Sequence, residues 1–172
     1  MARQIREKNL IFALCLPQKN NKRFLKEKRR MDHVVYLDFK AKELENLKKG
    51  TKTMIIRGAQ GRKFPYGKVE AGEQLYFIEN NGDGLIKASA RVSGVINAGP
   101  LGREESLALV HRHQEKLQLN AGLLKRFGGK RYLVLITIED FLETESFKID
   151  RSAYGNMDDW LPVGDIEKVR TP

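Results

Sequence analysis

The sequence has little that would support secretion or membrane insertion. Cys15 is the only cysteine among 172 residues, so no internal disulfide forms and nothing calls for an oxidising compartment. No apolar run approaches the roughly 18 residues that a membrane-spanning helix needs. Residues 10–16 are apolar and follow basic residues, as in a signal peptide, but no small-residue cleavage motif comes after them. The sequence therefore predicts a cytoplasmic protein.

Side chains for metal or covalent chemistry are also sparse. The histidines are His33, His111 and His113, and the last two are spaced so that a helix would point them to different faces. No glycine-rich phosphate loop of the P-loop or dinucleotide kind is present, and spacing nominates no Ser-His-Asp set. The sequence predicts no metal site and no cofactor.

Positive charge is concentrated at one end of the chain. Of the net charge of +10, residues 1–31 contribute +8, with ten Lys and Arg against two acids. Residues 32–172 carry 22 Lys and Arg against 20 acids and are close to neutral. The total charge therefore overstates any signal of nucleic-acid binding by the rest of the chain.

Residues 1–31 are predicted to be a basic N-terminal extension, and residues 32–172 a single domain. Four explanations of the extension stay open: a disordered or frayed helical arm, a nucleic-acid-binding arm, a solubilising tail, or a start-site artefact. The last rests on Lys26 and Glu27, which AAGGAG, a bacterial ribosome-binding sequence, would encode at a suitable distance before Met31.

The pattern of residues 32–172 predicts an α+β domain. Alternating β-branched and aromatic residues favour strands, and apolar residues three or four apart favour helices. Asp38 and Asn120 are expected to cap two of the helices. Strands are expected at residues 33–39, 52–57, 74–79, 85–96, 131–139 and 147–149, helices at 40–49, 103–117 and 121–127, and an irregular segment at 152–162. This order predicts a small mixed β-barrel with helices packed over its openings.

Residues 50–57, Gly-Thr-Lys-Thr-Met-Ile-Ile-Arg, mark a junction between a helix and a strand. Gly50 supplies the positive φ that commonly closes a helix. Lys52 and Arg57 stand at either end of a short, mostly apolar strand, where an unpaired buried charge would be costly. Either both cations reach water at the strand ends, or they line the mouth of a cavity for an anionic or polar ligand.

This segment resembles the signature of ASCH domains, a branch of the PUA-like β-barrels, whose pattern is G-x-K-x-x-E-x-R. Gly50, Lys52 and Arg57 match, and Ile55 replaces the glutamate. Residues 67–77 resemble the second strand entry of the family, and the resemblance covers residues 32 to about 166. It implies a PUA-like barrel that binds RNA or a modified nucleoside in a groove beside residues 50–57. DNA is an alternative partner, and no membrane is implied.

The resemblance assigns the groove to Lys52 and Arg57, with the basic loop residues Arg62 and Lys63 at its rim. Cations fix phosphates and aromatic rings stack on bases, so Tyr66 and Trp160 are further candidates for the binding site. A plainer interpretation stays open for both rings: Tyr66 packs within a turn, and Trp160 fills the core.

Some small bacterial ASCH proteins are N4-acetylcytidine amidohydrolases. Their proposed catalytic set joins the signature lysine, a threonine at the glutamate position and a glutamate on a following helical segment. Lys52 matches, and Glu115 is the candidate for the glutamate. Ile55 offers no hydroxyl, so catalysis is not expected, and Ile55→Thr is expected to raise it. A protein-interaction module without enzymatic activity is the second alternative, and the oligomeric state stays open.

Overall fold

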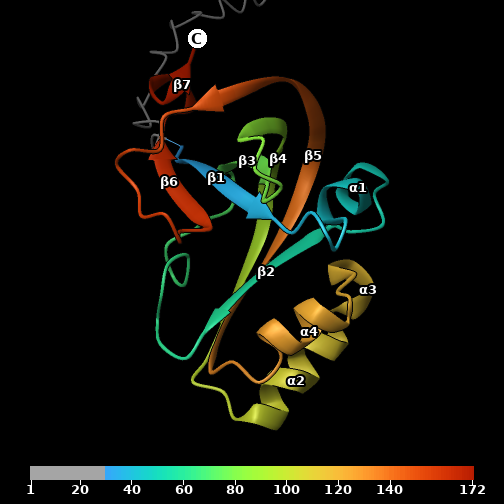
Figure 1. The fold of residues 1–172 in the computed structure, drawn as a ribbon. Helices are drawn as coiled ribbons and strands as arrows, with labels where there is room; N and C mark the ends of the chain where they lie inside the picture. Colours follow the sequence, from blue (N-terminus) through green and yellow to red (C-terminus); the bar gives the residue numbers. More distant parts are fainter. Residues whose placement is uncertain (1–29) are drawn as a thin grey trace, which may run out of the picture.

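The computed structural model describes residues 30–172, so the predicted basic extension lies almost entirely outside the described residues. The described chain forms one curled, mixed sheet with a group of helices at one end (Figure 1). None of its helices is long and apolar enough to cross a bilayer.

The sheet has seven strands, and its two ends do not pair with each other. The main path runs β2-β5-β4-β3-β1-β6, and β7 pairs with β5. β1 and β3 are parallel, and the other pairs are antiparallel. The strands are β1 (Asp32–Leu37), β2 (Met54–Ala59), β3 (Gln74–Glu79), β4 (Leu85–Ala98), β5 (Tyr132–Ile149), β6 (Trp160–Gly164) and β7 (Arg170–Thr171). β2 and β6 are therefore the edges of a half-barrel, and an open seam separates them.

Four helices and a 3-10 turn complete the fold: α1 (Glu43–Lys48), α2 (Arg103–Arg112), α3 (Gln114–Leu117), α4 (Ala121–Phe127) and η1 (Ile166–Lys168). One face of β2 packs against α2, α3 and α4, where Met54 and Ile56 join Val110, Leu117 and Leu123 in one apolar cluster. The α+β class and the curled sheet with helices over an opening confirm the predicted fold class. The predicted cap at Asn120 also forms, since its side chain accepts a hydrogen bond from the main-chain nitrogen of Leu123.

Two helices differ from their predicted bounds. Asp38 accepts from the main-chain nitrogen of Ala41, as a cap would, but Lys42 has a left-handed φ of 54° and α1 begins only at Glu43. The predicted helix over residues 103–117 is interrupted at His113 and becomes α2 and α3.

Two strands were wrongly placed by the sequence prediction. β5 is one strand of 18 residues, not two short ones, because β4 pairs with it from Leu85 opposite Lys148 to Ala98 opposite Leu133. Trp160, expected in an irregular segment, begins β6 and pairs with Val35 of β1. Pairing with a distant strand decided both cases, and local patterns carry no information on it.

Candidate nucleic-acid interface

A trough follows the open seam between β2 and β6. It consists of a large pocket of about 860 Å³ and a small pocket of about 310 Å³. The two pockets share six lining residues: Arg57, Arg126, Phe127, Met157, Asp158 and Asp159. We call the whole feature the seam trough.

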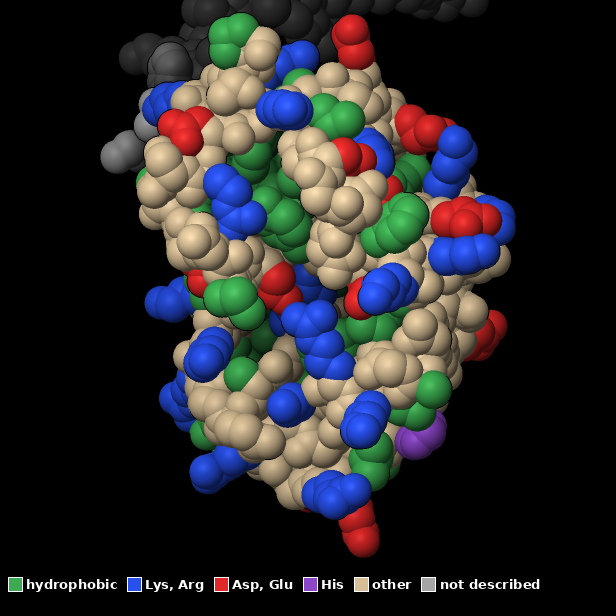
Figure 2. Space-filling view, viewed as in Figure 1, with side chains coloured by type: hydrophobic (Ala, Val, Ile, Leu, Met, Phe, Trp, Pro, Cys, Tyr) green, Lys and Arg blue, Asp and Glu red, His purple; other side chains and the backbone are tan. Residues whose placement is uncertain are grey.

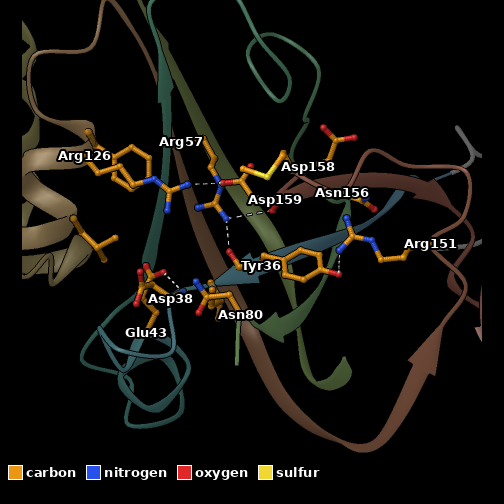
Figure 3. A pocket seen from close by; sticks show the side chains of 14 residues that line it. Tyr36, Asp38, Glu43, Arg57, Asn80, Arg126, Arg151, Asn156, Asp158 and Asp159 are labelled. Atoms are coloured by element: carbon orange, nitrogen blue, oxygen red, sulfur yellow. Dashed lines mark hydrogen bonds and ion pairs between the residues drawn. The ribbon is translucent and has the colours of Figure 1, made fainter. Parts of the chain in front are cut away.

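Arg57 projects from β2 across the seam (Figure 3). Its Nη2 donates to the main-chain oxygen of Tyr36 in β1 at 2.5 Å, and its Nε lies 3.1 Å from the Asp159 carboxylate. The guanidinium also lies over the ring of Trp160, 5.6 Å from the ring centroid. Arg57 is thus buried and ties the two edges of the half-barrel together where main-chain pairing is missing.

Lys52 is fully buried at the junction between α1, β2 and α3. Its Nζ lies 3.1 Å from Oε1 of Glu43 and donates to the main-chain oxygen of Leu117 at 2.5 Å. The other carboxylate oxygen of Glu43 accepts from the main-chain nitrogen of Asp38 at 2.8 Å. Burial lowers the pKa of Lys52, the carboxylate of Glu43 opposes this, and the charge of Arg57 adds to the lowering.

The interpretation that Lys52 and Arg57 reach water is therefore wrong, because both side chains are buried and paired. Arg57 does line the seam trough, whereas Lys52 lines neither pocket. Glu43, which sequence reasoning missed, reaches the small pocket and connects it to Lys52. The need of a buried lysine for a carboxylate could have pointed to the acids of the preceding helix.

The structure does not bring the predicted catalytic set together. Glu115 is exposed on α3, and the carboxylate beside Lys52 is that of Glu43. Ile55 is fully buried in the main core cluster, which also contains Leu47 and Val134. A threonine at this position would bury its hydroxyl in apolar surroundings, so Ile55→Thr is expected to destabilise the fold and not to raise catalysis.

The large pocket combines cations with aromatic rings. Its cations, apart from Arg57, are Lys63, Arg126 and Lys130. Six aromatic residues line it as well: Phe64, Tyr66, Phe127, Tyr132, Tyr154 and Trp160.

The predicted rim residues divide into two groups. Lys63 lines the large pocket, whereas Arg62 does not and lies over the ring of Tyr132, 5.6 Å from its centroid. Tyr66 lines the pocket and packs edge-on against Tyr132 with centroids 5.3 Å apart. Trp160 lines it too but is a buried member of the core cluster. The packing of both rings is therefore confirmed, and both border the pocket, whereas stacking on a base stays a prediction.

The small pocket has an apolar wall and charges of both signs. Leu37, Leu123 and Phe127 supply the wall. The labelled side chains of Figure 3 supply the polar surface: Tyr36, Asp38, Glu43, Arg57, Asn80, Arg126, Arg151, Asn156, Asp158 and Asp159. Arg126 lies 3.2 Å from Asp159, and Arg151 donates to the hydroxyl of Tyr36 at 2.6 Å. Within residues 30–172, no group of three or more potential ligands could hold a metal ion.

No protein-family model matches the chain, and no curated protein matches it by sequence. Solved structures of an ASCH protein from Zymomonas mobilis do match. A variant with one tyrosine replaced by phenylalanine superposes with a TM-score of 0.60 at 12% identity, over 81% of this chain and 94% of that one. The unsubstituted protein superposes with a TM-score of 0.58 at 11% identity, over 78% of this chain and 88% of that one. A serine-to-alanine variant superposes with a TM-score of 0.61 at 11% identity, over 81% of this chain and 93% of that one. This chain has an ASCH-like fold.

Charge is segregated within the ASCH-like domain, although its sum is close to neutral. Residues 101–131, which hold α2, α3 and α4, carry seven Lys and Arg against three acids. Residues 58–68 carry three Lys and Arg and no acid. Residues 132–172 carry four Lys and Arg against nine acids. Figure 2 shows Lys and Arg side chains gathered across the middle and lower part of one face, over β2 and these helices. The basic segments thus border the seam trough, which the total charge conceals.

Proposed function

We propose that this ASCH-like domain binds RNA or a modified nucleoside in the seam trough. The observation that carries the proposal is the large pocket, in which cationic side chains and aromatic rings line one cavity. Cations hold phosphates, and aromatic rings stack on bases of any sequence. The basic segments on both sides of the trough extend the same positive surface.

The cations that are free to bind phosphate are on the rim. Within residues 30–172, Lys63 and Lys130 have no ion-pair partner, and Arg126 is 52% exposed although it pairs with Asp159. Recruiting these groups costs little, because none has to leave a buried partner. Lys52 and Arg57, which the ASCH signature singles out, instead shape the trough from behind.

A titration of the full chain tests this proposal. We would measure binding of a labelled 12-nucleotide single-stranded RNA by fluorescence anisotropy at several salt concentrations, with cytidine and N4-acetylcytidine as competitors. The double variant Lys63→Ala, Lys130→Ala should bind more weakly, and its slope of log K against log salt should be smaller by about 1.5, since each phosphate contact contributes about 0.7–0.9.

The matched control is Lys148→Ala, Lys168→Ala, which removes two exposed lysines outside the seam trough. It should leave the slope close to that of the unsubstituted chain. Equal losses in both double variants would assign binding to general positive charge, the basic extension included, and would contradict a site in the trough.

A second candidate function is hydrolysis of N4-acetylcytidine. It is favoured by the carboxylate of Glu43, which lines the small pocket and contacts Lys52, whose pKa burial lowers. The missing hydroxyl at Ile55 weighs against it, so we expect no acetate release above background. Turnover that Glu43→Gln abolishes would instead establish the activity and place it in the small pocket.

A further inference from the structure

Met157 is an apolar side chain held in water over the seam trough. It is 94% exposed, and it lines both the large and the small pocket. Scattered apolar residues are common on protein surfaces, but one that borders two pockets is placed where a ligand would cover it.

The turn that carries Met157 is braced. The main-chain nitrogen of Asp158 donates to the oxygen of Gly155 at 3.1 Å, and the nitrogen of Gly155 donates back to the Asp158 carboxylate at 2.9 Å. Arg151 donates to the oxygen of Gly155 at 2.8 Å and to the hydroxyl of Tyr36 in β1. The exposed side chain therefore stands on a fixed support, and little ordering of the backbone is needed when it makes a contact.

A second exposed apolar side chain lines the same cavity from a different loop. Phe64 is 40% exposed and borders the large pocket. It lies beside Lys63, and the loop is anchored by Gly67, whose nitrogen donates to the side chain of Asn97 in β4 at 2.8 Å. The large pocket thus has an apolar contact on each of two anchored loops and free cations between α4 and β5 and on the 58–68 loop.

We infer that the ligand of the seam trough is single-stranded RNA, with one base turned out of its stack and packed against Met157 and Phe64. The inference rests on the proposed binding of RNA. The phosphates on either side of that base lie on Lys63, Arg126 and Lys130. An A-form duplex keeps its bases stacked inside, so it offers phosphates to the rim but no ring to Met157.

The test compares intact and abasic RNA on the full chain. Fluorescence anisotropy would give the affinity for a 12-nucleotide single strand, for the same strand without its bases, and for a duplex of the same length. Met157→Ala should weaken binding of the intact strand by about tenfold, the usual scale for losing one base contact, and leave the salt slope unchanged. Phe64→Ala should act in the same direction.

For the abasic strand and the duplex, Met157→Ala and the unsubstituted chain should bind alike. The matched control is Leu142→Ala, which removes an apolar side chain that is 63% exposed on β5 and lies outside both pockets. Melting temperatures of Met157→Ala, Leu142→Ala and the unsubstituted chain should agree within about a degree, because the substituted side chains make few packing contacts.

The results distinguish failure of the inference about the unstacked base from failure of the proposed RNA binding. If the unsubstituted chain binds the single strand but Met157→Ala binds it equally well, or loses affinity for the abasic strand to the same extent, the inference is overturned and the proposed function stands. If the unsubstituted chain binds no RNA at low salt, the inference and the proposed binding of RNA are both overturned, and only a nucleoside ligand stays compatible with the proposed function.

Discussion

The buried charges behind the seam trough and the charges on its rim differ in whether they are paired. Lys52 and Arg57 lie in the interior, and each is engaged by a carboxylate and a main-chain oxygen. Lys63 and Lys130 lie on the rim and have no ion-pair partner among residues 30–172. Buried ion pairs are expensive to break, whereas free surface cations are available to a ligand.

This difference separates the residues that a signature identifies from those that we propose to bind RNA. A charged residue in an apolar strand attracts notice in a sequence because it is unusual there. Its burial and pairing then make it a structural element of the fold. Of the rim lysines, Lys63 stands in a basic loop that the sequence already points to, whereas Lys130 is distinguished only by its position on the same cavity.

Removing the interior lysine should have the largest effect on stability. In Lys52→Met, the carboxylate of Glu43 stays buried without its cation, and the free energy of unfolding should fall by about 3–5 kcal/mol. Adding Glu43→Gln should restore part of the loss, because the uncompensated charge is then gone. Urea denaturation measures both, and Lys63→Met is the surface control, which should stay within about 0.5 kcal/mol of the unsubstituted chain. An unchanged urea midpoint for Lys52→Met would contradict a structural role of Lys52.

Arg57→Lys should open the seam and lower the free energy of unfolding by a smaller amount, about 2–4 kcal/mol. The loss arises because hydrogen bonds made by a charged donor are removed. A lysine cannot reproduce the several directed contacts that the guanidinium makes to Tyr36 and Asp159. Hydrogen exchange should show where the loss falls: amides of β6 should exchange faster, while those of β3, in the middle of the sheet, keep their relative protection. A uniform increase over all strands would argue against a bridge across the seam.

His33 is a buried group whose charge depends on pH, and its effect should be smaller still. Burial lowers the pKa of His33, although its hydrogen bond to Glu73 at 3.0 Å opposes this. The unfolded chain therefore binds this proton more readily than the folded one, and stability is lost as pH falls below about 6.5, by at most about 1.4 kcal/mol per pH unit. Urea denaturation at pH 7.5 and pH 5.5 should show a smaller acid loss in His33→Gln than in the unsubstituted chain.

The exposed His111 provides the control for this comparison. His111→Gln should lose as much stability on acidification as the unsubstituted chain, because it leaves the buried His33 in place. An acid loss in His33→Gln equal to that of the other two proteins would show that His33 does not contribute to the pH dependence.

A single rim substitution should have the smallest effect and act on binding alone. Lys63→Ala should lower RNA affinity severalfold at low salt and reduce the salt slope by about 0.7–0.9, with no change in the urea midpoint. Lys52→Met, measured where it is still folded, should keep the slope of the unsubstituted chain. A reduced slope for Lys52→Met would mean that the buried lysine contacts phosphate after all.

Local patterns predicted the elements whose signals are local. The β3 strand at Gln74–Glu79 was predicted with its observed bounds, because a run of apolar and aromatic residues lies between turn residues. The cap at Asn120 was predicted for the same kind of reason. β6 was missed because its place depends on pairing with β1, more than a hundred residues earlier in the chain.

The candidate site divides in the same way. Sequence analysis nominated Lys63 as a rim cation and Tyr66 as an aromatic ring of the groove, and both line the large pocket. It missed Met157, because no local pattern shows that a single methionine lies over a cavity. It also missed Glu43, because the carboxylate that neutralises Lys52 can be chosen only when the helix and the strand are packed together.

Cross-linking tests the central claim, that RNA lies on the rim of the seam trough, most directly. A single-stranded RNA containing 4-thiouridine would be irradiated with the full chain, and the modified peptides identified by mass spectrometry. Cross-links should fall on the 58–68 loop and the 150–159 segment, at Phe64, Tyr66 or Met157, and should be reduced in Lys63→Ala, Lys130→Ala. Cross-links confined to residues 1–31 would contradict the account and assign binding to the basic extension.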